Sequence, residues 1–90
     1  MFDYYGTIQK ANSVSRQASD LRAQASNMSS LLNIVGNEYS GKDAQAYYDA
    51  VKKAQNELLS IASELDSIST QIRSAAETVL EEELAKNEID

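Results

Sequence analysis

The stretch of sequence that decides the fold covers residues 36–41, which read Gly36-Asn37-Glu38-Tyr39-Ser40-Gly41. It contains two of the three glycines in this 90-residue chain, which has no proline. Glycine and proline are the residues that most often interrupt a helix, and neither occurs in residues 7–35 or 43–85. This distribution predicts one domain over residues 1–90 in which two long helices are joined by a single turn. The predicted segments are helix one at about residues 7–36, the turn at 37–42, helix two at about 43–85 and a loose acidic tail at 86–90.

Apolar residues recur in both helical stretches at alternating spacings of three and four. The first row is Ile8, Ala11, Val14, Ala18, Leu21, Ala25, Met28, Leu32 and Val35. The second row is Ala44, Tyr47, Val51, Ala54, Leu58, Ile61, Leu65, Ile68, Ile72, Ala75 and Val79. An average spacing of 3.5 residues is typical of helices that pack along a coiled-coil seam. We therefore predict an all-α fold, an antiparallel helix-turn-helix hairpin.

The ends of the two helices can be assigned from their residue types. Gly36 is expected to close helix one in the left-handed conformation, because glycine adopts it without steric cost. Ser40 or Asp43 is expected to cap helix two, since either side chain can accept a hydrogen bond from a free backbone N–H.

Two helices alone leave part of each apolar row exposed, so we expect the hairpin to pair with another hairpin in a four-helix bundle. A further apolar row on helix two, which includes Tyr48, Leu59, Ala62 and Leu80, lies beside the first and also needs cover. The residues expected in the hairpin and dimer seam are Leu21, Met28, Leu32, Tyr47, Val51, Leu58, Ile61, Leu65, Ile68 and Ile72.

The composition argues against most chemical activities. Fourteen acidic residues against eight basic ones give a net charge of −6, which disfavours a nucleic-acid partner. Cysteine and histidine are absent, which removes thiol nucleophiles, imidazole bases and the usual zinc ligands. We therefore predict no enzyme, no catalytic residues, no cofactor and no metal. The sequence also shows neither a Sec-type signal nor an apolar run approaching the ~20 residues of a membrane span, so stable membrane insertion is not expected.

Tyr39-Ser40-Gly41, placed between two helices with heptad spacing, resembles the Trp-x-Gly turn of the WXG (ESAT-like) family of small type VII secretion proteins. Ala44 and Tyr47-Tyr48 follow the glycine where that family places a small residue and then an aromatic one. Residues 64–73 are also similar to the corresponding part of helix two in mycobacterial members. The resemblance covers nearly the whole chain, with tyrosine in place of the turn tryptophan.

The resemblance implies a protein that is exported as a folded helical dimer. In that family the export signal combines the turn of one subunit with a Tyr-x-x-x-Asp/Glu motif after helix two of its partner. By position, the turn residues here are Tyr39, Ser40 and Gly41, and the tail motif falls on Val79 and Glu83, with valine where tyrosine is expected. The implied partners are the type VII export ATPase and, in a homodimer or heterodimer, another small hairpin or the helical N-terminal domain of a toxin. The implied location is secreted, with a cytoplasmic pool before export.

Several interpretations stay open at this point. Tyr39 can either cover the helix junction or contact an export partner, and Val79 and Glu83 can be ordinary seam and solvated acid rather than an export element. The chain can be a type VII substrate or helper that presents a larger toxin, or a cytoplasmic helical adaptor or structural bundle protein unrelated to secretion. The negative charge disfavours membrane disruption. A carboxylate enzyme using Glu57, Glu64 or Asp66 is disfavoured because a narrow bundle offers no convergent pocket.

Overall fold

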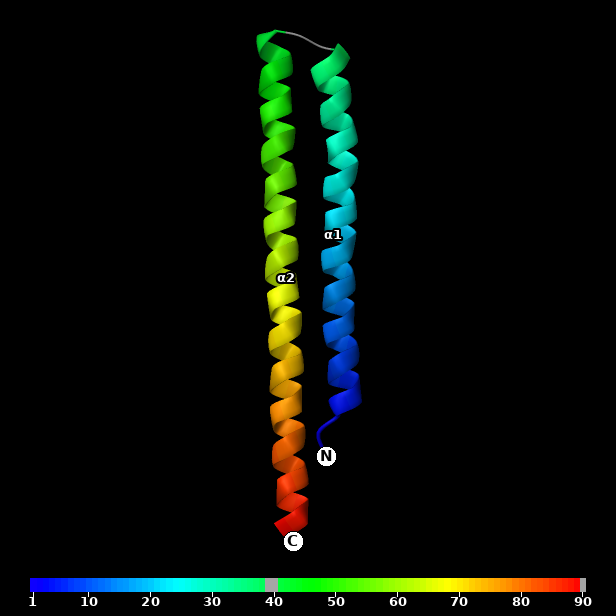
Figure 1. The fold of residues 1–90 in the computed structure, drawn as a ribbon, viewed down its shortest axis with the longest axis vertical. Coiled ribbons are helices and arrows are strands. Elements are labelled where there is room, and N and C mark those ends of the chain that lie inside the picture. The colour runs from blue at the N-terminus through cyan, green and yellow to red at the C-terminus, as the bar shows by residue number, and fades with distance from the viewer. Residues whose placement is uncertain (39–40, 90) are drawn as a thin grey trace.

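The chain folds as two antiparallel helices in a computed structural model that describes residues 1–38 and 41–89, with the side chains of residues 1–36 and 41–87. Helix α1 spans Tyr4–Glu38 and helix α2 spans Lys42–Ile89. The two lie side by side along the whole length of α1 (Figure 1). The predicted all-α hairpin is therefore confirmed.

Helix α1 begins three residues earlier than predicted because Asp3 caps it. The Asp3 carboxylate accepts a hydrogen bond of 2.9 Å from the backbone N–H of Gly6, and the Asp3 carbonyl accepts bonds from Thr7. A side-chain acceptor of this kind satisfies one of the free N–H groups in the first turn of a helix. Gly6 leaves the space that this cap needs, since an added Cβ would lie 2.3 Å from a carboxylate oxygen of Asp3.

The expectation that Gly36 ends α1 in the left-handed conformation is wrong. The helix continues through Gly36 to Glu38, and the glycine with a positive φ, at +102°, is Gly41, where the chain enters α2. Its carbonyl accepts the N–H of Gln45 at 3.1 Å, which is the first turn of α2. Asp43 is not the cap either, because it lies inside that first turn, where its charge favours the positive end of the helix dipole. The other candidate cap, Ser40, lies outside the described residues.

The molecule is a rod with unequal arms. Its extents are 74 × 15 × 13 Å, and its radius of gyration of 20.9 Å compares with about 12 Å for a globular chain of this length. Helix α2 has 48 residues against 35 in α1, so its last turns extend beyond the start of α1 (Figure 1). Residues 86–89, expected as a loose tail, continue α2.

A row of small side chains forms the contact between the helices. The most buried residues recur every seven positions on each helix, and most of them are alanine, serine or glutamine rather than large apolar residues. Small side chains allow two helix backbones to lie close together. The small-residue row consists of Ala11, Ala18, Ala25 and Leu32 on α1, and Gln55, Ala62, Ser69 and Ala76 on α2.

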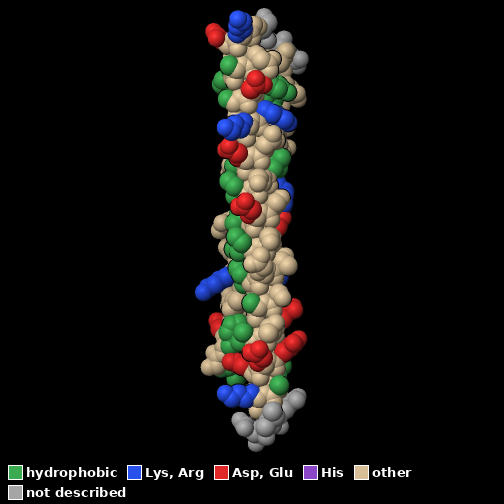
Figure 2. Space-filling view, turned by 90° about the vertical axis from the view of Figure 1, so that its left-hand side faces the viewer, with side chains coloured by type: hydrophobic (Ala, Val, Ile, Leu, Met, Phe, Trp, Pro, Cys, Tyr) green, Lys and Arg blue, Asp and Glu red, His purple; other side chains and the backbone are tan. Residues whose placement is uncertain are grey.

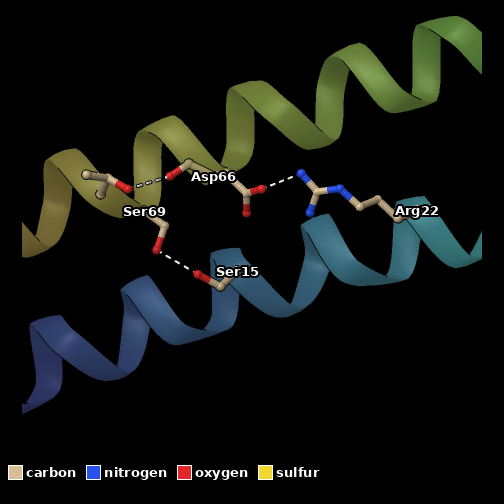
Figure 3. A network of polar contacts seen from close by, with 5 residues as sticks. Ser15, Arg22, Asp66 and Ser69 are labelled. Atoms are coloured by element: carbon tan, nitrogen blue, oxygen red, sulfur yellow. Dashed lines mark hydrogen bonds and ion pairs between the residues drawn. The ribbon is translucent and has the colours of Figure 1, made fainter.

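Two polar residues of this row bind the backbone of α1 directly. Ser69 donates to the carbonyl of Ala11 at 2.9 Å, and its oxygen lies 2.7 Å from the hydroxyl of Ser15 (Figure 3). Gln55 donates from its amide nitrogen to the carbonyl of Ala25 at 2.8 Å and to the hydroxyl of Ser29 at 2.7 Å. A serine side chain reaches a carbonyl inside another helix only where the two backbones are close. Equivalent partners are fourteen residues apart, so one arrangement repeats after two heptads: Gln55 and Ser69, Ala11 and Ala25, Ser15 and Ser29.

The thin contact leaves a large surface exposed. The rod exposes 6617 Å², whereas a globular monomer of 9.9 kDa exposes about 5,200 Å². Among the described residues, no large apolar side chain is fully buried. Most of the large apolar side chains are therefore available for contact with another molecule.

The small-residue row can be tested by overpacking it. In Ala18→Leu the larger side chain has no room between the helices, because Ala18 is completely buried, and we expect a loss of roughly 1–3 kcal/mol in the free energy of unfolding. Thermal unfolding followed by circular dichroism should show a Tm lower by about 5 °C or more. Ala23→Leu, on the exposed face of the same helix, is the matched control and should melt like the wild type. Equal melting of the two variants would contradict the proposed packing.

The cap of α1 gives a second test. Asp3→Ala removes the acceptor of the Gly6 N–H and should destabilise the fold by about 1 kcal/mol. Amide hydrogen exchange should show the loss concentrated in the first turns of α1. Asp20→Ala removes an exposed carboxylate from the middle of the same helix and should leave those amides unchanged.

Candidate protein-interaction surface

One side of the hairpin is polar. Arg22 forms an ion pair with Asp66, and Arg73 donates to the side chain of Asn12. The Arg22–Asp66 contact lies beside the Ser15–Ser69 contact (Figure 3). Both partners of the ion pair are more than 40% exposed, so the pair contributes little to stability. Its position identifies the polar side of the hairpin.

The opposite side is apolar. Residues three positions after most members of the small-residue row are large, apolar and half-buried; Val35 is instead buried, and Val79 is exposed. On α2 a further row outside them is largely exposed. Tyr47 is 51% exposed, and Ile61 and Ile68 are each 45% exposed. Together these two rows form the apolar face, which consists of Val14, Leu21 and Met28 on α1, and Tyr47, Val51, Ala54, Leu58, Ile61, Leu65, Ile68, Ile72, Ala75 and Val79 on α2.

The apolar side chains of α2 continue along most of the rod. Figure 2 shows hydrophobic side chains recurring down the length of the molecule, with Asp and Glu side chains gathered toward the C-terminal end of α2. Apolar exposure that recurs over such a length is the usual mark of a protein–protein contact. The feature that the geometry offers is therefore a candidate binding face.

The predicted seam residues lie in two places, either between the two helices or on the apolar face. Leu32 is buried between the helices, at 6% exposed, whereas the other nine lie on the apolar face. On α1 the predicted row also contained the buried residues Ala11, Ala18 and Ala25, but on α2 the row facing α1 is a different one. The signal that was missed is the strict seven-residue spacing of Gln55, Ala62, Ser69 and Ala76. Contact of the apolar face with a partner stays a prediction.

The candidate export residues occupy the end of the rod opposite the turn. Val79 is 36% exposed at the end of the apolar face, and Glu83 accepts a 3.0 Å hydrogen bond from the backbone N–H of Phe2. This bond, which no local sequence signal predicts, ties the N-terminal segment to α2. Of the turn residues, Gly41 is exposed, while Tyr39 and Ser40 lie outside the described residues.

The described residues contain no group of three or more acidic side chains that could hold a metal ion. A shallow depression runs along the outer surface of α2, lined by Asp49, Lys52, Lys53, Asn56, Glu57 and Ser60. All six come from one helix, so the depression lacks the convergent groups of an active site. Over the described part of the chain, neither helix is long and apolar enough to cross a membrane.

The comparisons with known proteins agree with this geometry. The WXG100 family, described as proteins of 100 residues with WXG, matches residues 1–83. Searches of curated proteins and of solved structures found no significant match. The family match covers both helices and the turn between them, apart from the last residues of α2. The chain therefore belongs to the WXG100 family, whose members are small helical proteins associated with type VII secretion.

Proposed function

We propose that this chain is a type VII secretion substrate or targeting partner that pairs through its apolar face with a second helical hairpin. That hairpin is another small WXG-type protein or the helical N-terminal domain of a toxin, and the pair presents itself, or the toxin, to the export ATPase. The single observation that carries the proposal is the unpaired apolar face beside a hairpin contact built from small residues.

The size of the apolar face supports pairing. Burying the exposed half of about ten large apolar side chains contributes on the order of 10 kcal/mol. That is comparable with the loss of translational and rotational freedom when two proteins associate. Two hairpins that place such faces together form a four-helix bundle, in which the large side chains become a shared core.

The separation of the two candidate export elements supports pairing as well. Glu83 follows Gly41 by 42 positions along α2, which is about 63 Å, so one hairpin cannot bring its own turn and tail together. A partner lying in the opposite direction would place its tail beside this turn. Since Val79 stands where the family motif has tyrosine, we propose that the partner supplies the complete tail motif.

The apolar face can be tested with a matched pair of variants. Ile61→Asp/Ile68→Asp places two carboxylates in the proposed interface and should weaken association on the order of 100-fold, because a buried charge without a partner is costly. Leu59 is similarly exposed, at 41%, but lies outside the apolar face, so Leu59→Asp should associate and be exported like the wild type. Size-exclusion chromatography with light scattering and the extracellular protein level are the measurements. Equal behaviour of both variants would reject the apolar face as the binding surface.

The secretion route has a direct test. In producing cells that lack the type VII ATPase, the extracellular level of this protein and of any toxin exported with it should fall to background while the intracellular level is maintained. An unchanged extracellular level would rule out the proposed route. Stable retention inside wild-type cells would instead favour a cytoplasmic helical adaptor.

A further inference from the structure

The apolar face has an acidic edge on α2. Glu57 and Glu64 lie one heptad apart, directly beside the exposed row that contains Ile61, and both are exposed. Among the described residues, neither carboxylate forms an ion pair with a side chain of its own hairpin. Glu64 also has no charged residue three or four positions away on its helix. The Glu64 carboxylate is therefore available to interact with a molecule that covers the apolar face.

The hairpin register shows which part of α1 lies level with this edge. Ser15 meets Ser69 and Ser29 meets Gln55, so residues at the same height along the rod have numbers that sum to 84. Glu64 is therefore level with residue 20 of α1, which is also acidic, and Lys10 is level with residue 74, away from both glutamates. At the height of the acidic edge, over residues 20–27, the only cation of α1 is Arg22, and it lies on the polar side, where it pairs with Asp66.

A second copy of this chain can cover the apolar face in two symmetric ways. If the copies point in opposite directions, α2 packs on α2 about the middle of the apolar face, near Ile61, and Glu57 falls within one turn of Glu64 of the second copy. If the copies point in the same direction, α2 packs on α1, and Glu64 falls level with Asp20 of the second copy. Both arrangements place like charges together at the edge of the interface.

We infer that Glu57 and Glu64 select a partner hairpin that carries Lys or Arg at the facing positions, in preference to a second copy of this chain. The inference rests on the proposed function, in which the apolar face is the binding surface. Exposed charge pairs contribute little affinity individually, whereas charges flanking an apolar helix seam decide which partner is chosen. We expect the two glutamates together to change the preference about tenfold.

The protein itself provides the test. In Glu57→Lys/Glu64→Lys the acidic edge becomes basic, so an equimolar mixture of this variant with the wild type should associate about tenfold more tightly than the wild type alone at low salt. Sedimentation equilibrium measures both, and 1 M salt should remove most of the difference. Asp49→Lys/Glu77→Lys makes the same change in net charge on α2 away from the apolar face, and its mixture with the wild type should associate like the wild type alone.

Measurements of export distinguish a failure of this inference from a failure of the proposed function. In producing cells, Glu57→Lys/Glu64→Lys should be exported several-fold less than the wild type, whereas Asp49→Lys/Glu77→Lys should be exported normally. A mixture no tighter than the wild type alone, or a tight wild-type dimer that is insensitive to salt, would overturn the inference. If Glu57→Lys/Glu64→Lys is exported normally but Ile61→Asp/Ile68→Asp is not, the apolar face stands and the charge selection fails. Normal export of both variants would reject the apolar face itself.

Discussion

The close contact between two rows of small residues determines the rest of this structure. Ala18 and Ala62 are completely buried, and Ser69 donates directly to a backbone carbonyl of α1. Where Ala62, Ser69 and Ala76 face α1, the backbones are too close for leucine or isoleucine on α2, so the large apolar residues of α2 lie beside the contact rather than inside it. Gln55 repeats the Ser69 contact two heptads away, which fixes both the register and the rotation of α2. The apolar face is the direct consequence of that rotation.

The helices could be predicted because their signals are local: the absence of proline, the position of the glycines and the 3.5-residue spacing. The rotation of α2 about its own axis could not be predicted, because a hydrophobic pattern predicts Ile61 and Leu65 as core residues in preference to Gln55. Gln55 is nevertheless buried, since its amide meets acceptors on α1 that only the paired structure provides. The sequence predicts too late a start for α1 because glycine usually interrupts a helix, whereas Gly6 makes room for the Asp3 cap.

The candidate export site shows the same division between local and long-range signals. Val79 and Glu83 were located by resemblance to a family motif, which depends on position along the chain. The bond from Phe2 to Glu83 joins residues 81 positions apart, and it exists because the hairpin register brings the N-terminal segment level with that part of α2. No local pattern contains this information. The candidate tail element is therefore a surface made by both ends of the chain.

In this hairpin small residues lie between the helices and large apolar residues lie outside. We therefore expect the stability of the fold to depend on association. The rod is only 15 × 13 Å across, and the side chains that would form the core of a globular domain are half-exposed. Their full burial requires a second molecule, so the stability of the pair depends on the partner's concentration as well as on this sequence. In the proposed complex such a chain would reach its full stability, which fits the proposed export of a folded pair.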